Sequence, residues 1–244
     1  MRGPVLFTTS WDDGNPLDVR IADTLEEFGF VGTFYASTGP DGRRLIDDGD
    51  LARIGRKHEL GAHGRSHRIF PELPPSALAD EIHWAVEEMS RFGNVGDVVA
   101  PPRGKIDAPT RRFIGHLGFA VRTGAVVGSA GVNSNSLEPT FQLYPHTWKT
   151  ITRNCVYRRR LPNASLLIAL ARKGSPEDRF RQMLLAAAEH QRHVHVWGHA
   201  AEIQRLDLWD ALRRLLRTAA DLGLTPVSNS DAFHRLSRGA RRTT

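Results

Sequence analysis

The sequence contains a single cysteine, Cys155, in 244 residues. One cysteine excludes an internal disulfide and any metal cluster built on several thiolates. Long hydrophobic runs are missing as well, because the apolar run at residues 166–171 is much shorter than the ~20 residues that a membrane-spanning helix requires. The sequence therefore predicts neither a disulfide-stabilised scaffold nor a membrane span.

Two further absences concern location and partners. The first residues, MRGPVLFTTSW, contain no long apolar stretch and no small-residue cleavage site, so no secretory signal is expected and a cytoplasmic location is the default prediction. Lysine supplies only four of the 33 basic residues, and arginine carries the net charge of +6. The arginine-rich segments 153–160 and 238–244 lack interleaved aromatic residues, so we interpret them as solvated surface and expect no nucleic-acid partner.

Length and composition fit one globular domain. Hydrophobic residues make up 40% of the chain and charged residues 25%, which is close to the average for soluble proteins. We expect one domain over residues 1–236 and a basic, disordered tail over residues 237–244. The sequence does not indicate an oligomeric state.

Short runs of β-branched and aromatic residues alternate with longer segments of helical periodicity, which is typical of an α/β fold with a parallel sheet. The expected strands span residues 5–10, 31–37, 59–63, 97–101, 119–124, 146–151, 193–199 and 225–229. Amphipathic helices are expected over residues 76–92, 177–191 and 207–223, and a long loop over residues 126–145. About eight strands in alternation with helices favour a closed (β/α) barrel of seven or eight units over an open, doubly wound sheet.

Unusual polar residues follow the expected strands, at the edge where parallel barrels place their active sites. Asp12 and Asp13 follow the first strand, and His63 and His67 follow the third. Two histidines four residues apart can direct both imidazoles to one point, and a carboxylate completes a set of ligands that suits zinc or non-haem iron. Because neighbouring side chains of an extended chain point in opposite directions, one aspartate suffices as a ligand, which leaves the other to act as a general base.

Two other strand ends carry candidate residues. The fourth strand ends in VAPPRGK, where Pro102, Arg103 and Gly104 form either a rigid turn or a wall of the site, with the Arg103 N–H available to an oxyanion. The seventh strand carries three histidines, and His199 lies at its end. Histidine titrates near neutral pH, which suits a general acid or base.

In this order the motifs resemble those of the carbohydrate esterase 4 family, the NodB-homology polysaccharide deacetylases. SWDDG is similar to the first motif, HGRSH to the second, APPRGK to a variant of the third and VWGH to the last, and GFVGTFYAS resembles the segment between the first two. The resemblance implies a distorted (β/α) barrel and metal-dependent removal of N-acetyl groups from amino sugars by a catalytic domain. It implies these roles: Asp12 as base, His199 as acid, and Asp13, His63 and His67 as metal ligands.

The chain departs from the family pattern in several places. Gly64 stands where Ser or Thr is usual, Ala100 where many members have the arginine that holds the base, and Arg103 where tyrosine is usual. No fourth motif, the Asp-Trp element that orients the catalytic histidine, is evident. We hypothesise that Arg122 supplies the missing positive charge and that Glu202 orients His199. We also expect the substrate or the catalytic groups to be contacted by Trp197, Pro102, Arg103 and Gly104.

These observations predict one divalent metal ion, with zinc favoured and cobalt, nickel or iron compatible with the same ligands. The expected reaction is removal of an N-acetyl group from an amino sugar in an oligosaccharide, a glycolipid or a glycosylated metabolite. Two alternatives remain open. One is a hydrolase of another non-peptide C–N bond, such as a cyclic amide or ureide. The other is a metal-free, non-catalytic carbohydrate-binding scaffold.

Overall fold

The computed structural model describes residues 4–38, 44–128, 130–158, 162, 164–171 and 174–241. Its strands are β1 (Leu6–Asp13), β2 (Thr33–Ala36), β3 (Glu59–Ala62), β4 (Val98–Val99), β5 (Ala120–Arg122), β6 (Gly131–Asn133), β7 (Ser136–Glu138), β8 (Phe141–Gln142), β9 (His193–Gly198) and β10 (Thr225–Pro226). Its α-helices are α1 (Asp18–Glu27), α2 (Asp48–Gly55), α3 (Pro75–Ser90), α4 (Ala108–His116), α5 (Trp148–Arg158), α6 (Ala164–Ala171), α7 (Pro176–His190), α8 (Ala200–Arg205), α9 (Trp209–Asp221) and α10 (Asn229–Arg241). Short 3-10 turns, η1 (Phe70–Glu72) and η2 (Pro102–Gly104), follow β3 and β4.

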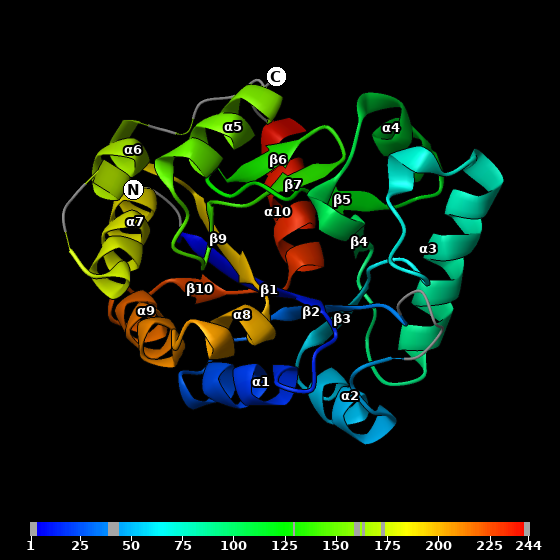
Figure 1. Cartoon of the computed structure of the whole chain (residues 1–244), viewed down its shortest axis with the longest axis horizontal. Helices are drawn as coiled ribbons and strands as arrows, with labels where there is room; N and C mark the ends of the chain where they lie inside the picture. The colour runs from blue at the N-terminus through cyan, green and yellow to red at the C-terminus, as the bar shows by residue number, and fades with distance from the viewer. Residues whose placement is uncertain are drawn as a thin grey trace.

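The strands form two sheets at the centre, and most helices surround them (Figure 1). One sheet has the parallel order β3-β2-β1-β9-β8, with β10 beside the first residues of β1. The other has the order β4-β5-β7-β6, in which β6 runs antiparallel to β7. The sheets meet on both sides, where Ala100 N–H donates to Ala62 O at 3.0 Å and Gln142 N–H donates to Val126 O at 3.0 Å. This arrangement confirms the expected single-domain α/β barrel.

Strand β1 shows why the site lies inside this barrel. Phe7 and Trp11 are buried in the main hydrophobic core. The alternate side chains bond to polar residues of other strands. Thr8 bonds to His193 and Ser10 to His195 of the neighbouring β9, each at 2.9 Å, and Asp12 bonds to Arg122 of β5 in the other sheet. The period-two alternation of the strand therefore directs Asp12 into a polar interior.

The interior histidines predict how stability changes with pH. Burial lowers the pKa of His193 to about 3, so below pH ~6.5 the unfolded chain binds a proton that the folded chain does not. We expect the free energy of unfolding to decrease as pH falls from ~6.5 towards 3, by up to ~1.4 kcal/mol per pH unit for this group. Urea unfolding between pH 7 and pH 4.5 should therefore show a flatter slope in His193→Gln than in the exposed control His116→Gln. Equal slopes would contradict this assignment.

Two expectations for the middle of the chain are wrong. Residues 146–151 do not form a strand, because Thr147 Oγ1 accepts from Thr150 N–H at 3.3 Å and caps the first turn of α5. The expected loop at residues 126–145 contains β6, β7 and β8. These strands have two or three residues each. β7 pairs with β5 and β8 pairs with β9, so their strand conformation depends on hydrogen bonds to segments that are distant in the sequence.

The C-terminal segment of the described chain is helical. Helix α10 packs against β1, β4, β6 and β7 and continues to Arg241, so the boundary expected at residue 236 falls inside a helix. Residues 242–244 of the expected tail, and 159–160 of the first arginine-rich segment, lie outside the described residues. Among the described helices, none combines the length and hydropathy needed to cross a membrane. The cytoplasmic location stays a prediction.

Candidate active site

The carboxyl ends of the strands surround a cleft of about 670 Å³. Nine of the eleven residues expected at the site line it: Asp12, Asp13, His63, His67, Arg103, Gly104, Trp197, His199 and Glu202. Of the other two, Pro102 is buried in η2 and Arg122 is buried beneath the cleft floor. The fold therefore brings together residues that lie at or just after the ends of β1, β3, β4 and β9, as expected for the rim of a parallel barrel.

Asp13, His63 and His67 converge on one point of the cleft. Their potential ligand atoms all lie within 4.8 Å of one another. Asp13 Oδ1 is 3.3 Å from His63 Nε2 and 3.2 Å from His67 Nε2. Burial raises the pKa of the Asp13 carboxyl, but hydrogen bonding and charge interactions with the two imidazoles, together with the charge of His199, lower it more, so the net shift is downward.

This donor set fits a divalent metal ion. His63 Nδ1 lies 2.7 Å from the carbonyl oxygen of Ala100, which can only accept a hydrogen bond, so Nδ1 is protonated and Nε2 keeps its lone pair. His67 Nε2 is also buried and lies beside the same carboxylate oxygen, 3.2 Å from Asp13 Oδ1. Two imidazole nitrogens beside one carboxylate oxygen match the ligands of catalytic zinc sites.

The end of β1 explains how two neighbouring aspartates share one cleft. Asp13 has a φ of 83°, so the chain leaves the extended conformation there and both carboxylates line the cleft. The following turn is fixed because Asn15 Oδ1 accepts from Leu17 N–H and Asp18 Oδ2 accepts from Asn15 N–H, each at 3.0 Å. A left-handed φ at a non-glycine residue has an energetic cost, and such residues are concentrated at functional sites.

The HGRSH segment is positioned from behind by Glu81 of α3. The Glu81 carboxylate accepts hydrogen bonds from both the N–H and the hydroxyl of Ser66. Gly64 has a φ of 73°, and a Cβ there would lie 3.2 Å from Glu81 Oε2. Glycine in place of the usual Ser or Thr is therefore consistent with this backbone and with the position of Glu81.

Asp12 is paired with Arg122 of β5. One guanidinium nitrogen contacts both carboxylate oxygens, and the two side chains are 5% and 1% exposed. The guanidinium also lies over the rings of Trp197 and Tyr35, 4.7 and 5.3 Å from their centroids. Arg122 of β5 thus places a positive charge against the Asp12 carboxylate.

A conservative substitution tests whether Arg122 positions Asp12. Removing a buried ion-pair partner outright costs ~3–5 kcal/mol of stability, so Arg122→Ala would confuse folding with function. Arg122→Lys keeps the charge but loses the planar guanidinium, and we expect kcat to fall about ten- to a hundredfold at nearly constant KM and metal content. Unchanged turnover with the lysine variant would remove Arg122 from the site.

His199 lies at the opposite side of the cluster, at the end of β9. Its Nδ1 donates to Glu202 Oε2 at 2.8 Å, and its Nε2 lies 3.8 Å from Asp13 Oδ2. Burial lowers the pKa of His199, but the hydrogen bond to Glu202 and the charges of Asp12, Asp13 and Glu202 outweigh burial and raise it to about 9. The carboxylates around His199 therefore favour its protonated form.

Glu202 is itself held by residues that the sequence did not indicate. Gln142 of β8 donates from Nε2 to Glu202 Oε2 at 3.1 Å, and its Oε1 accepts from His146 Nε2 at 2.8 Å. Burial lowers the pKa of His146 to about 4, so this imidazole is neutral. Both residues lie within the segments whose secondary structure was predicted incorrectly, which is why they were missed.

Helix α5 and the η2 turn complete the cleft. Thr150, Arg153, Asn154, Tyr157 and Arg158 of α5 line it, and no role in the cleft was expected for any of them. The run RNCVYRRR was the available indication, but its charge was interpreted as solvated surface. In η2, a Cβ on Gly104 would lie 2.9 Å from Gly124 Cα, so glycine is needed where this turn approaches the end of β5.

The first half of the chain matches a known family. A family model described as polysaccharide deacetylase matches residues 3–121, which include Asp12, Asp13, His63 and His67. By this match, residues 3–121 are similar to the polysaccharide deacetylase family. The resemblance noted in the motifs is thereby confirmed. The search of curated proteins found no match.

Solved structures of the same fold cover nearly the whole chain. The Xyl-CE4 domain of a multidomain xylanase from the hindgut metagenome of Trinervitermes trinervoides has a TM-score of 0.62 at 16% identity, covering 96% of this chain and 91% of its own. Peptidoglycan deacetylase PdaC from Bacillus subtilis has a TM-score of 0.54 at 17% identity, with coverage of 99% and 95%. A family 4 carbohydrate esterase from Streptomyces lividans, in complex with acetate, has a TM-score of 0.54 at 14% identity, with coverage of 92% for both chains. At these identities the likeness shows the fold.

Proposed function

We propose that this protein is a metal-dependent hydrolase that removes an N-acetyl group from an amino sugar. One observation carries the proposal: the cluster of Asp13, His63 and His67 shares one cleft with Asp12, which is paired with Arg122, and with His199, which is paired with Glu202. A ligand set, a fixed carboxylate and a protonated imidazole in one cleft are the groups that amide hydrolysis needs. The match of residues 3–121 to the polysaccharide deacetylase family model supports the same reaction.

Asp13, His63 and His67 would hold the metal ion. A divalent cation held there supplies a Lewis acid that polarises the acetamide carbonyl and lowers the pKa of a water molecule. The residues behind the ligands support this assignment. The Ala100 carbonyl fixes the tautomer of His63, and Glu81 fixes the loop that carries His67 through its bonds to Ser66.

Asp12 acts as the general base. It removes a proton from the attacking water while the water oxygen forms a bond to the carbonyl carbon. Arg122 compensates the charge of the buried carboxylate and limits its rotation by contacting both oxygens. A base that is already oriented loses little conformational freedom when it reacts.

His199 acts as the general acid. Its Nδ1–H is engaged with Glu202, so Nε2 is the nitrogen that faces the cluster and donates a proton to the leaving amine. The C–N bond then breaks, and the products are acetate and the free amino sugar. Arg103 lines the same cleft, and its backbone N–H, for which no acceptor is found among the described residues, would donate to the developing oxyanion.

The altered third motif leaves a cyclic amide or ureide as an alternative substrate. The ion pair between Arg122 and Asp12 supplies a positive charge that this motif lacks, which favours the N-acetyl reaction over that alternative. A metal-free scaffold is disfavoured because one cleft is lined by Asp12, Asp13, His63, His67 and His199.

A substrate panel tests the proposed function. The zinc-loaded protein is incubated with N-acetylated monosaccharides, oligosaccharides, glycolipids and glycosides, and acetate and free amine are measured together. We expect equimolar acetate and amine from at least one class of substrate. Metal-loaded protein that releases acetate from none of them, but opens a cyclic amide or ureide, would replace this proposal with the alternative.

A further inference from the structure

The cleft walls carry more positive charge than the catalytic groups need. Arg103, Lys105, Arg153 and Arg158 line the cleft together with the carboxylates of Asp12, Asp13 and Glu202. Each of those carboxylates already has a positive or metal-binding neighbour. Asp12 pairs with Arg122, Glu202 with His199, and Asp13 lies against the two ligand histidines.

Three of the four wall cations remain without an acidic partner. Arg158 is 3.0 Å from Glu138 Oε1 and 2.9 Å from Thr123 Oγ1, so its charge is compensated. Across the part of the chain that the structure describes, no carboxylate lies within 4.0 Å of the charged nitrogens of Arg103, Lys105 or Arg153. These three exposed side chains form the basic wall.

The basic wall combines two separate elements. Arg103 and Lys105 belong to the turn after β4, whereas Arg153 belongs to α5. Lys105 Nζ lies 4.8 Å from the centre of the Tyr157 ring of α5, which places the turn and the helix beside each other. Charges from distant parts of the sequence therefore collect on one side of the cleft, where low-dielectric walls strengthen their field.

The backbone of Arg103 gives an independent indication. Its φ is 57°, in the left-handed region, where a residue with a Cβ costs about 1–2 kcal/mol and glycine costs little. Asp13 and His67 of the same cleft also have positive φ values, of 83° and 55°. Arg103 thus shares an energetically costly conformation with two of the proposed metal ligands, which is consistent with a functional side chain.

We propose that the substrate carries an acidic group, a carboxylate or a phosphate, on the acetylated sugar or on the unit bound beside it, and that Arg103, Lys105 and Arg153 bind this group. The inference rests on the proposed deacetylase function. A neutral oligosaccharide would leave these three side chains without an anionic partner. An anionic group would gain charge-assisted hydrogen bonds from arginine, whose planar guanidinium suits both carboxylate and phosphate.

Three matched substrates test this inference on the unaltered, zinc-loaded protein. The neutral substrate is an N-acetylglucosamine tetramer, the carboxylate substrate is a tetramer of alternating N-acetylglucosamine and glucuronic acid, and the phosphate substrate is N-acetylglucosamine 1-phosphate. We expect kcat/KM to be about tenfold or more higher for at least one acidic substrate than for the neutral one. This advantage should decrease between 20 mM and 500 mM salt because of screening. The two acidic substrates distinguish a carboxylate from a phosphate.

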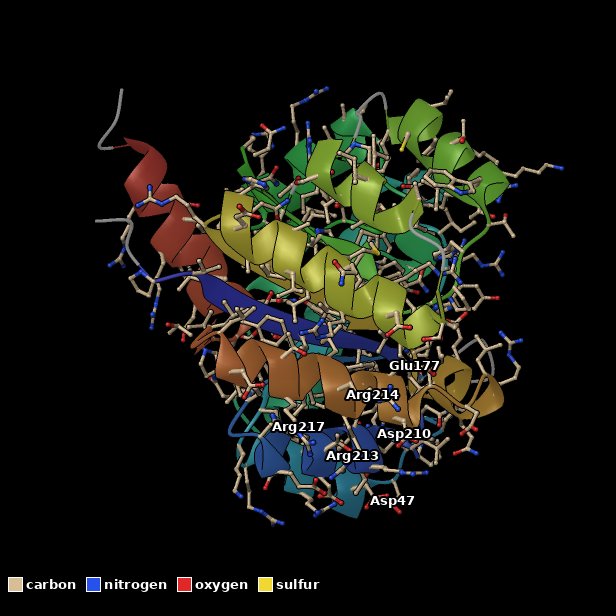
Figure 2. The ribbon with its side chains drawn as sticks, turned by 90° about the vertical axis from the view of Figure 1, so that its left-hand side faces the viewer. Asp47, Glu177, Asp210, Arg213, Arg214 and Arg217 are labelled. Atoms are coloured by element: carbon tan, nitrogen blue, oxygen red, sulfur yellow. The ribbon has the colours of Figure 1, made fainter. Side chains whose placement is uncertain are left out.

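Variants then assign the effect to the basic wall. Lys105→Ala and Arg153→Ala should each raise KM for the acidic substrate about tenfold, with less than a twofold change for the neutral substrate and no change in bound zinc. The control is Arg214→Ala on the exposed surface of α9 (Figure 2), which should change neither KM.

The outcomes separate this inference from the function on which it rests. Equal kcat/KM for the neutral and acidic substrates, or equal effects of the variants on both, would overturn the acidic-substrate inference and leave the deacetylase proposal intact. Release of acetate from none of the substrates, with zinc bound, would overturn both.

Discussion

Asp12→Asn is expected to keep the metal and lose turnover. The asparagine amide cannot accept the proton that the proposed base removes from water, and general bases typically contribute about 10²–10⁴-fold to a rate. Because Asp12 contacts Arg122 rather than the ligand histidines, we expect the zinc content to stay near that of the wild type. The measurement combines kcat for acetate release with elemental analysis of the same preparation.

The matched control for this substitution is Asp210→Asn. Asp210 is an exposed aspartate in the first turn of α9 (Figure 2), and its replacement should leave both kcat and zinc content unchanged. An Asp12→Asn protein that has lost its zinc, or that retains more than about a tenth of wild-type kcat, would be inconsistent with a base that is separate from the ligands.

Asp13→Asn is expected to lose the metal first and turnover as a consequence. Its carboxylate oxygen lies within 3.3 Å of both ligand histidines, and an amide is a much poorer ligand for zinc. Loss of a partner that only orients a ligand typically costs 10–100-fold in affinity, so loss of the carboxylate itself should cost at least about a hundredfold. Competition with a zinc chelator measures the affinity.

Excess zinc provides the second readout for Asp13→Asn. Partial recovery of activity at high zinc would agree with a weakened metal site. Full zinc affinity in this variant, with or without activity, would contradict the ligand assignment. Thermal unfolding of the zinc-free proteins controls for misfolding, because Asp13 is 43% exposed and its substitution should leave the core unchanged.

The sequence predicted the strands near the two ends of the chain well and those in its middle poorly. The structure places each end of β1, β2, β3 and β9 within three residues of the expected end. β7 and β8 have only three and two residues, and they are strands because β5 and β9 provide hydrogen-bonding partners. Periodicity within a short window carries no information about such distant pairing.

In the candidate site, too, residues in short local motifs were easier to predict than residues that come from distant parts of the chain. Asp12, Asp13, His63, His67 and His199 belong to short motifs, so their residue types and spacing were visible in the sequence. Arg122 and Glu202 were found as hypotheses because a charge and an orienting group were missing from the motifs. The structure brings each to the expected neighbour.

The sequence did not predict that α5 lines part of the cleft, and there is a physical reason for this. Residues 147–151 are rich in β-branched side chains, and the capping bond from Thr150 to Thr147 and the packing of Ile151 into the core favour the helix over the intrinsic strand preference. Once α5 is a helix, Arg153 and Tyr157 are four residues apart and share one face that borders the cleft. The arginine-rich segment then becomes part of the site.

The central claim is that one divalent metal ion, held by Asp13, His63 and His67, makes this cleft an N-deacetylase. The most direct test removes all metal by chelation, adds zinc in steps and follows acetate release from the best substrate of the panel. The account predicts no acetate from the metal-free protein and a rise in activity that reaches its maximum at one zinc per chain. Acetate release that continues undiminished after the metal has been removed would contradict it.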